Sequence, residues 1–197
     1  MTPDTKEVEN GTTNGPSVSL RTGRKLTRNY DLMHLGLRLV SLLASIVALA
    51  VMINSKEKST ISLYGFEVPV YSKWSFSESF DYLVGVTSVV AIHSLLQLFM
   101  TSRMLLKKCS VISSRNHAWL LFAGDQVFAF AMMSAGSAAS GVTNLNRTGI
   151  KHSSLPNFCK ALHSFCDRVA LSIAFTFFGC FLLAMSVVLD VVWLSEY

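Results

Sequence analysis

The chain has 197 residues, of which 51% are hydrophobic and 15% charged, and its mean hydropathy is +0.43. An ordinary soluble domain carries about 25% charged residues, so this composition argues against a soluble globular protein. Lysine and arginine outnumber aspartate and glutamate by 17 to 12, but the excess lies in short segments between apolar runs. This distribution is typical of membrane topology and argues against a nucleic-acid-binding protein.

The N-terminal part of the chain is polar and has no apolar period. Residues 1–19 are rich in Thr, Asn, Gly, Pro and Glu, a composition that cannot bury enough apolar surface to offset the entropy lost on ordering. A basic cluster follows directly before the first apolar run and favours the cytosolic side of a membrane. We therefore predict a disordered cytosolic tail over residues 1–29 and a transmembrane domain over residues 30–197. The cluster consists of Arg21, Arg24, Lys25 and Arg28.

Four apolar windows are long enough to cross a bilayer, which requires about 20 helical residues each. They cover residues 32–53, 82–100, 118–140 and 169–194. Because polar residues precede the first window, we expect it to be an uncleaved membrane anchor rather than a signal peptide. The sequence thus predicts an all-α membrane protein built as a four-transmembrane-helix bundle.

The segments between the windows set the expected orientation. The loop after the second window holds Arg103, Lys107, Lys108 and Arg115 and no acid, which favours the cytosolic side and places both termini there. The first outer segment, residues 54–81, contains an alternating, β-branched stretch from Ile61 to Tyr71. That pattern predicts a short extracellular β-hairpin.

Two opposite charges lie inside the apolar windows. An isolated charge there costs about 2.5–3.5 kcal/mol, so Arg38 and Asp125 both require compensation. At about 1.5 Å of rise per residue, both lie roughly 10–15 Å from the same membrane side. We predict an interhelical ion pair, with Gln126 and Ser41 as candidates for the further hydrogen bonds that such a pair needs.

A second interpretation of these charges is a conducting path. His93 and Gln97 lie at comparable depth in the second window and would join Arg38 and Asp125 in an ion or proton relay. The pattern favours the structural pair, with His93 as a hydrogen-bonded interior residue.

The third window also carries a run of small residues. Gly136 and Ser140, and likewise Ser137 and Gly141, stand four residues apart, a spacing that favours close approach of two helices. The partner is either another helix of the same chain or a second copy. These four positions are therefore our candidates for an oligomer interface.

Two features lie in the second outer segment, residues 141–168. Cys159 and Cys166 would face an oxidising compartment, and a turn between them would allow a disulfide. A straight helix over residues 161–165 would instead keep them apart as free thiols. Asn146-Arg147-Thr148 is a candidate N-glycosylation site.

The chain lacks the motifs that carry common catalytic chemistry. GxSxG, HExxH, P-loop and GxGxxG patterns do not occur, and the four cysteines do not have the spacing of a structural zinc site. We expect no enzymatic activity, no cofactor and no metal.

Several of these features, in this order, resemble the Casparian strip membrane domain protein-like (CASP-like) family of plants, which is related to the four-span MARVEL proteins. The resemblance covers residues 28–193. It implies that Arg38 and Asp125 are the family's intramembrane charges and that Cys159 and Cys166 are its outer-loop cysteines. The matching segments are Leu37-Arg38-Leu39-Val40, Tyr71-Ser72 through Phe80-Asp81-Tyr82-Leu83-Val84, Asp125-Gln126, Phe158-Cys159 and Phe165-Cys166.

The resemblance also implies a function. Such a protein is a plasma-membrane scaffold that self-associates, alone or with related family members, into stable membrane domains in contact with lipid. It positions cell-wall-modifying proteins rather than catalysing a reaction. The alternative is a small ion or proton channel or transporter that uses Arg38, His93 and Asp125.

Overall fold

The computed structural model describes residues 17–63, 66–106, 115–149 and 158–196. Four helices in these ranges are long and apolar enough to cross a membrane, which confirms the predicted four-helix membrane bundle. Their elements are α1 (Ser17–Ile53), α2 (Glu78–Leu106), α3 (Arg115–Thr148) and α5 (His163–Glu196), with a one-turn helix α4 (Phe158–Ala161) before the last.

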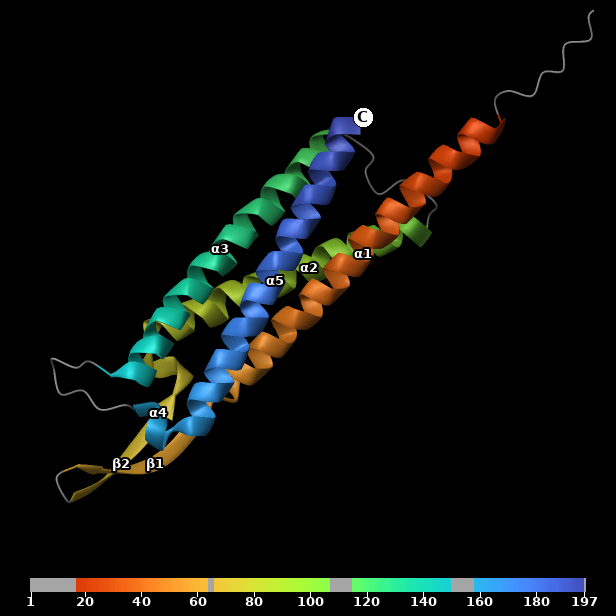
Figure 1. Cartoon of the computed structure of the whole chain (residues 1–197). Coiled ribbons are helices and arrows are strands. Elements are labelled where there is room, and N and C mark those ends of the chain that lie inside the picture. The colour runs from red at the N-terminus through yellow and green to blue at the C-terminus, as the bar shows by residue number, and fades with distance from the viewer. Residues whose placement is uncertain (1–16, 64–65, 107–114, 150–157, 197) are drawn as a thin grey trace, which may run out of the picture.

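The four long helices surround a common axis (Figure 1). Helix α1 packs against α2 and α5, and α3 packs against the same two helices, so α1 and α3 face each other across the diagonal. The start of α1 and the C-terminus of α5 lie at one end of the bundle, here called the termini end. The two strands and α4 lie at the other, the hairpin end.

A two-stranded antiparallel sheet extends from the hairpin end, as the alternating pattern predicted. Strands β1 (Lys56–Leu63) and β2 (Phe66–Lys73) pair so that Lys56 lies opposite Lys73. The base of the hairpin is tied to the bundle by the Glu57 carboxylate, which accepts a hydrogen bond from the Phe165 backbone N–H at 2.6 Å. A short 3₁₀ turn, η1 (Trp74–Phe76), leads from β2 into α2.

The helices are longer than the apolar windows. Helix α1 begins at Ser17, so residues 17–29, which the sequence analysis placed in the tail, are helical, and residues 1–16 lie outside the described ranges. The other three long helices also extend beyond their windows. Hydropathy registers only the apolar stretch, whereas backbone hydrogen bonding continues along a helix into the polar membrane interface.

The core is concentrated between α1, α2, α3 and α5 at the hairpin end. Met52, Phe80 and Leu83 are buried there against Phe165 and Val169, and a smaller cluster around Met132 and Leu183 lies nearer the middle of the bundle. Alanines 135 and 139 of α3, both fully buried, allow this helix to pack closely.

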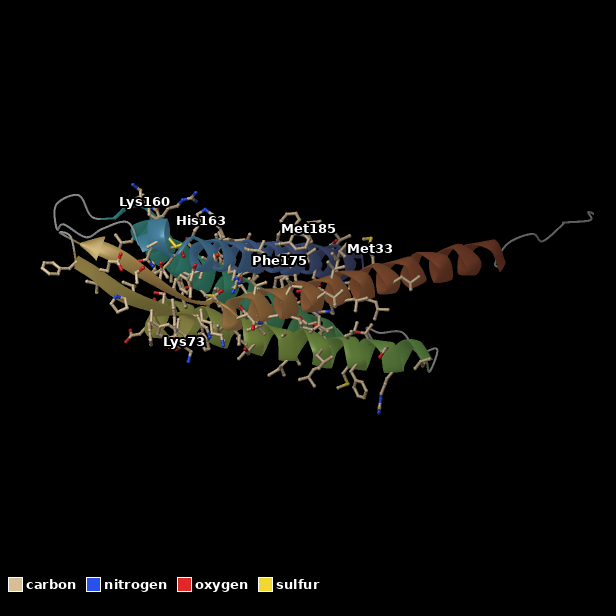
Figure 2. All side chains as sticks on the ribbon, turned by 90° about the horizontal axis from the view of Figure 1, so that it is seen from below. Met33, Lys73, Lys160, His163, Phe175 and Met185 are labelled. Atoms are coloured by element: carbon tan, nitrogen blue, oxygen red, sulfur yellow. A yellow bond between two sulfur atoms is a disulfide. The ribbon has the colours of Figure 1, made fainter. Side chains whose placement is uncertain are left out.

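The outward faces of the helices are apolar. Large side chains exposed there include Leu43, Ile92, Leu96, Phe130 and Phe181. Figure 2 shows Met33 and Met185 along the helices, whereas Lys73, Lys160 and His163 gather at the hairpin end. An apolar belt between charged ends is the surface expected of a bundle in contact with lipid.

Candidate functional site

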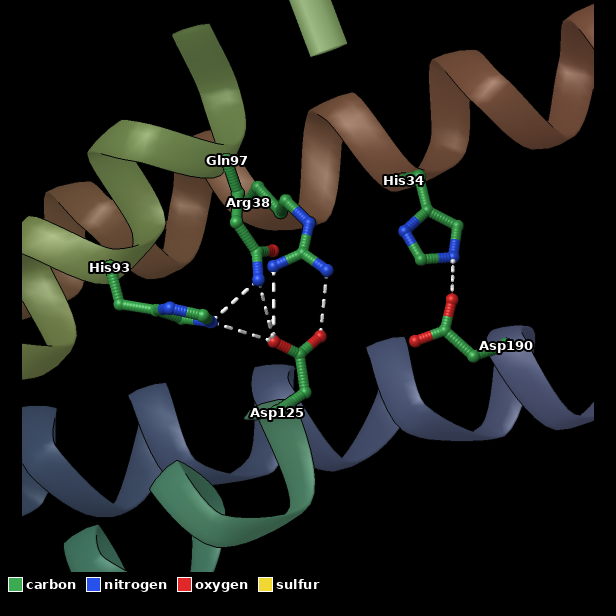
Figure 3. Close-up of polar contacts among 6 residues, drawn as sticks. All are labelled: His34, Arg38, His93, Gln97, Asp125 and Asp190. Carbon is green, nitrogen blue, oxygen red and sulfur yellow. Dashed lines mark hydrogen bonds and ion pairs between the residues drawn. The ribbon is translucent and has the colours of Figure 1, made fainter. Parts of the chain in front are cut away.

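The centre of the site is an ion pair across the diagonal of the bundle (Figure 3). Arg38 of α1 and Asp125 of α3 are 3% and 0% exposed. Arg38 Nη1 donates to Asp125 Oδ1 at 3.1 Å and Nη2 donates to Oδ2 at 2.7 Å. Two parallel charge-assisted hydrogen bonds of this kind fix both the distance and the orientation of the partners.

Helix α2 supplies two further members of the cluster. His93 Nε2 lies 3.3 Å from Asp125 Oδ1, and Gln97 Nε2 lies 2.6 Å from His93 Nε2 and 3.5 Å from the same carboxylate oxygen. The Gln97 amide nitrogen can donate to the Asp125 carboxylate, and the donor between Gln97 and His93 is set by the tautomer of the His93 ring. Arg38, Asp125, His93 and Gln97 therefore form one connected polar cluster.

Neither of the two expected supporting residues hydrogen-bonds to the ion pair within the described part of the chain. The Ser41 hydroxyl is buried and has no hydrogen-bond partner within the described part of the chain. Gln126 is half-buried and takes no part in the hydrogen bonds that described residues form with Asp125. The additional contacts to the ion pair come from α2 instead, because α2 packs against both α1 and α3.

The structure also places a second charged pair in the bundle. Asp190 of α5 is 2% exposed, and its Oδ1 lies 3.0 Å from Nε2 of His34 on α1, one helical turn from Arg38. The distance is that of an ion pair, but the imidazole is not aligned for a hydrogen bond. This pair was not predicted from the sequence, although an acid inside the last apolar window was the available signal.

The small-residue run of α3 divides between two faces. Gly136 is buried, and a Cβ atom there would lie 3.1 Å from the Phe177 ring of α5, so this glycine permits a contact within the chain. Ser137 and Gly141 are exposed, and a Cβ at Gly141 would meet nothing within 4 Å. Ser140 is half-buried and donates to the Ser137 carbonyl at 2.9 Å.

The cysteine pair lies at the hairpin end. A disulfide joins Cys159 of α4 to Cys166 of α5, with their Cα atoms 5.8 Å apart, which confirms the predicted disulfide. Helical structure is interrupted at Leu162, and this turn brings the two cysteines together.

Other predicted features lie at the edges of what the structure describes. Asn146 is half-buried in the last turns of α3, and its glycosylation stays a prediction. Of the basic loop, Lys107 and Lys108 lie outside the described residues, whereas Arg103 is exposed at the termini end of α2 and stacks 4.3 Å from the Phe99 ring centroid.

Comparison with known proteins places this chain in a family. Residues 27–182 match the Casparian strip membrane protein domain. The chain is 64% identical over 190 residues to CASP-like protein 3A1 of Vitis vinifera, with 96% of this chain and 90% of the relative covered. It is 59% identical to CASP-like protein 3A1 of Populus trichocarpa, with 94% and 86% covered, and 56% identical to that of Picea sitchensis, with 87% and 84% covered.

No solved structure matches the chain. The four apolar helices define a multi-pass membrane protein. The chain belongs to the CASP-like family of Casparian strip membrane domain proteins.

Proposed function

We propose that this chain is a non-catalytic plasma-membrane scaffold that homo-oligomerises into stable membrane domains and positions cell-wall-modifying proteins. The observation that carries the proposal is the difference between the inward and outward faces of α3. Its buried charged residue, Asp125, is bound inside the chain by Arg38, whereas the small residues on its outward face are exposed. The match to the Casparian strip membrane protein domain supports the same function.

The outward face of α3 is suited to a second helix. Four small residues there are exposed, and they recur at helical spacing. In a membrane, small side chains favour association because they let two helix backbones approach closely. We call this surface the α3 small face; its residues are Ser134, Ser137, Ala138 and Gly141.

The proposed orientation has both termini in the cytosol and the hairpin outside the cell. Arg103 at the termini end is consistent with the excess of basic residues on the cytosolic side of membrane proteins. The Cys159–Cys166 disulfide at the opposite end suits an oxidising, extracellular environment. The hairpin and α4 are then the surfaces available to wall-associated proteins.

The proposal is tested by native mass spectrometry of the protein in nanodiscs, with two glycine variants. Gly141 and Gly85 are both exposed, and a Cβ at either meets nothing within 4 Å, so we choose leucine as the matched substitution at both positions. We expect wild type and Gly85→Leu to form the same closed homo-oligomer and Gly141→Leu to dissociate. A wild type that stays monomeric at all concentrations contradicts the proposal.

A second candidate function rests on a separate observation, the contact of His93 and Gln97 with Asp125. We propose as the alternative that Arg38, His93 and Asp125 serve as a proton or ion relay. Proteoliposomes loaded with a pH-sensitive dye would then show flux that Asp125→Asn abolishes. No flux in well-reconstituted wild-type vesicles rules this alternative out.

A further inference from the structure

Asp190 is a buried carboxylate, and only one of its two oxygens contacts a polar group among the described residues. Its Oδ1 faces His34 Nε2 at 3.0 Å, whereas Oδ2 has no hydrogen-bond partner within the described residues. In Figure 3 the second oxygen points away from His34, toward the side where Arg38 and Asp125 lie. One turn earlier on α5, the Ser186 hydroxyl is also buried and has no hydrogen-bond partner among the residues that the structure describes. A buried ionised carboxylate in this condition requires a compensating charge.

The charges within the bundle do not balance. Among residues whose burial is described, the buried charged side chains are Arg38, Asp125 and Asp190, which together give one negative charge. Arg38 uses both of its terminal nitrogens on Asp125. On α2, His93 is half-buried and contacts Asp125 and Gln97. Within the described residues, the titratable group that contacts Asp190 is His34 of α1.

We infer that His34 and Asp190 form a proton-binding site between α1 and α5. The bound proton resides on the His34 imidazole, which becomes a cation beside the Asp190 carboxylate and brings the charge of the bundle core to zero. An imidazole and a carboxylate 3.0 Å apart suit a proton better than an alkali-metal ion, which prefers a shell of several oxygens.

The position of the site gives the proton a mechanical role. Both residues lie near the termini end of their apolar spans, which run from Leu32 in α1 and to Val192 in α5. Protons from that membrane side have a short path to the site. With the proton bound, the ion pair holds α1 against α5; without it, the Asp190 carboxylate is uncompensated and this end of the bundle loosens.

An exposed pair in the same chain provides a matched control. His163 and Asp167 of α5 also lie 3.0 Å apart, but their side chains are 81% and 67% exposed, against 14% and 2% for His34 and Asp190. Water screens the exposed pair, so the attraction between its two side chains is weak. The two pairs therefore compare the same contact with and without burial.

The experiment is ¹⁵N NMR of the five histidines of the full chain in nanodiscs at pH 7, with His34 assigned by His34→Gln. We expect the shifts of His34 to be those of an imidazolium, with hydrogen on both ring nitrogens. Asp190→Asn keeps the shape of the side chain and should lower the ratio of protonated to neutral His34 by about tenfold or more. Asp167→Asn should change the same ratio for His163 by less than about twofold.

Two results overturn the inference. One is a neutral His34 in wild type at pH 7. If replacing Na⁺ and K⁺ by choline then also destabilises the protein, a metal ion and not a proton compensates the charge of Asp190. The other is equal protonation of His34 in wild type and in folded Asp190→Asn. If Asp190→Asn does not fold, the wild-type spectra at pH 7 still decide, and the outcome is independent of the oligomeric state.

Discussion

Arg38 and Asp125 meet across the diagonal of the bundle, joined by hydrogen bonds of 3.1 and 2.7 Å, although α1 and α3 are not adjacent helices. The pair is almost completely buried, so neither charge can turn to water if its partner is lost. This contact thus directly connects two helices that otherwise pack mainly against α2 and α5.

Removing one member of this pair should destabilise the bundle strongly. Arg38→Ala or Asp125→Ala leaves the other charge buried alone, at an expected cost of about 3–5 kcal/mol in the free energy of unfolding. Thermal unfolding in mild detergent measures the loss. The exposed Arg103 is the control, because Arg103→Ala should cost less than about 1 kcal/mol.

The double variant Arg38→Met/Asp125→Leu separates an uncompensated charge from lost packing. Replacing both partners by apolar side chains should restore most of the stability, since no buried charge remains. A double variant as unstable as the sum of the two single variants would contradict this account.

Leucine should destabilise the monomer at only one of the two glycines in the α3 small-residue run. Gly136→Leu must displace the Phe177 ring, which a Cβ atom alone would approach to 3.1 Å, and overpacking of this kind costs about 1–3 kcal/mol. Gly141→Leu should leave monomer stability unchanged because the position is open. Melting temperatures of the two variants in detergent provide the test, and equal melting temperatures would show that Gly136 is not a packing position.

Loss of the disulfide should loosen the hairpin end while the bundle persists. Cys159→Ser opens an eight-residue loop, worth about 2–3 kcal/mol in the chain-entropy account. Reductant should destabilise wild type and leave Cys159→Ser unaffected. Cys180→Ser, which alters a thiol within the bundle, should respond to reductant as wild type does; insensitivity of wild type to reductant would oppose the prediction.

The Glu57 carboxylate should control how firmly the hairpin is held. Glu57→Gln weakens the charge-assisted bond to the Phe165 N–H, so amide hydrogen exchange at Phe165 should accelerate by about tenfold, corresponding to 1–2 kcal/mol. Glu67→Gln is the matched control, because Glu67 is an exposed residue of β2. Equal exchange rates at Phe165 in the two variants would mean that Glu57 does not anchor the hairpin.

Sequence alone predicts three features of this fold because each has a local or energetic signature: the helices, the hairpin and the Arg38–Asp125 contact. Apolar windows identify spans, alternation identifies strands, and a charge in an apolar run requires a partner. The rotation of each helix about its axis is set by packing of the whole bundle. Sequence reasoning therefore chose Gln126 and Ser41 as supporting residues, whereas α2 presents Gln97 to the carboxylate.

Two further features depend on helix rotation and could not be predicted from the sequence for the same reason. They are the contact made by Asp190 and the division of the small-residue run between two faces of α3. Asp190 lies in an apolar window like Arg38 and Asp125, but its partner His34 comes from the opposite end of the chain. Spacing alone could not show that Gly136 faces Phe177 inside the chain while Gly141 faces outward.

The most direct test of self-association through the α3 small face is cysteine cross-linking in native membranes. Ser137→Cys, in a Cys109→Ser/Cys180→Ala background, should give a disulfide-linked dimer on mild oxidation because Ser137 is exposed on that face. Ile92→Cys, equally accessible on α2 at 59% exposure, should stay monomeric. Absence of the Ser137→Cys dimer, or equal cross-linking at both positions, would contradict the proposed scaffold interface.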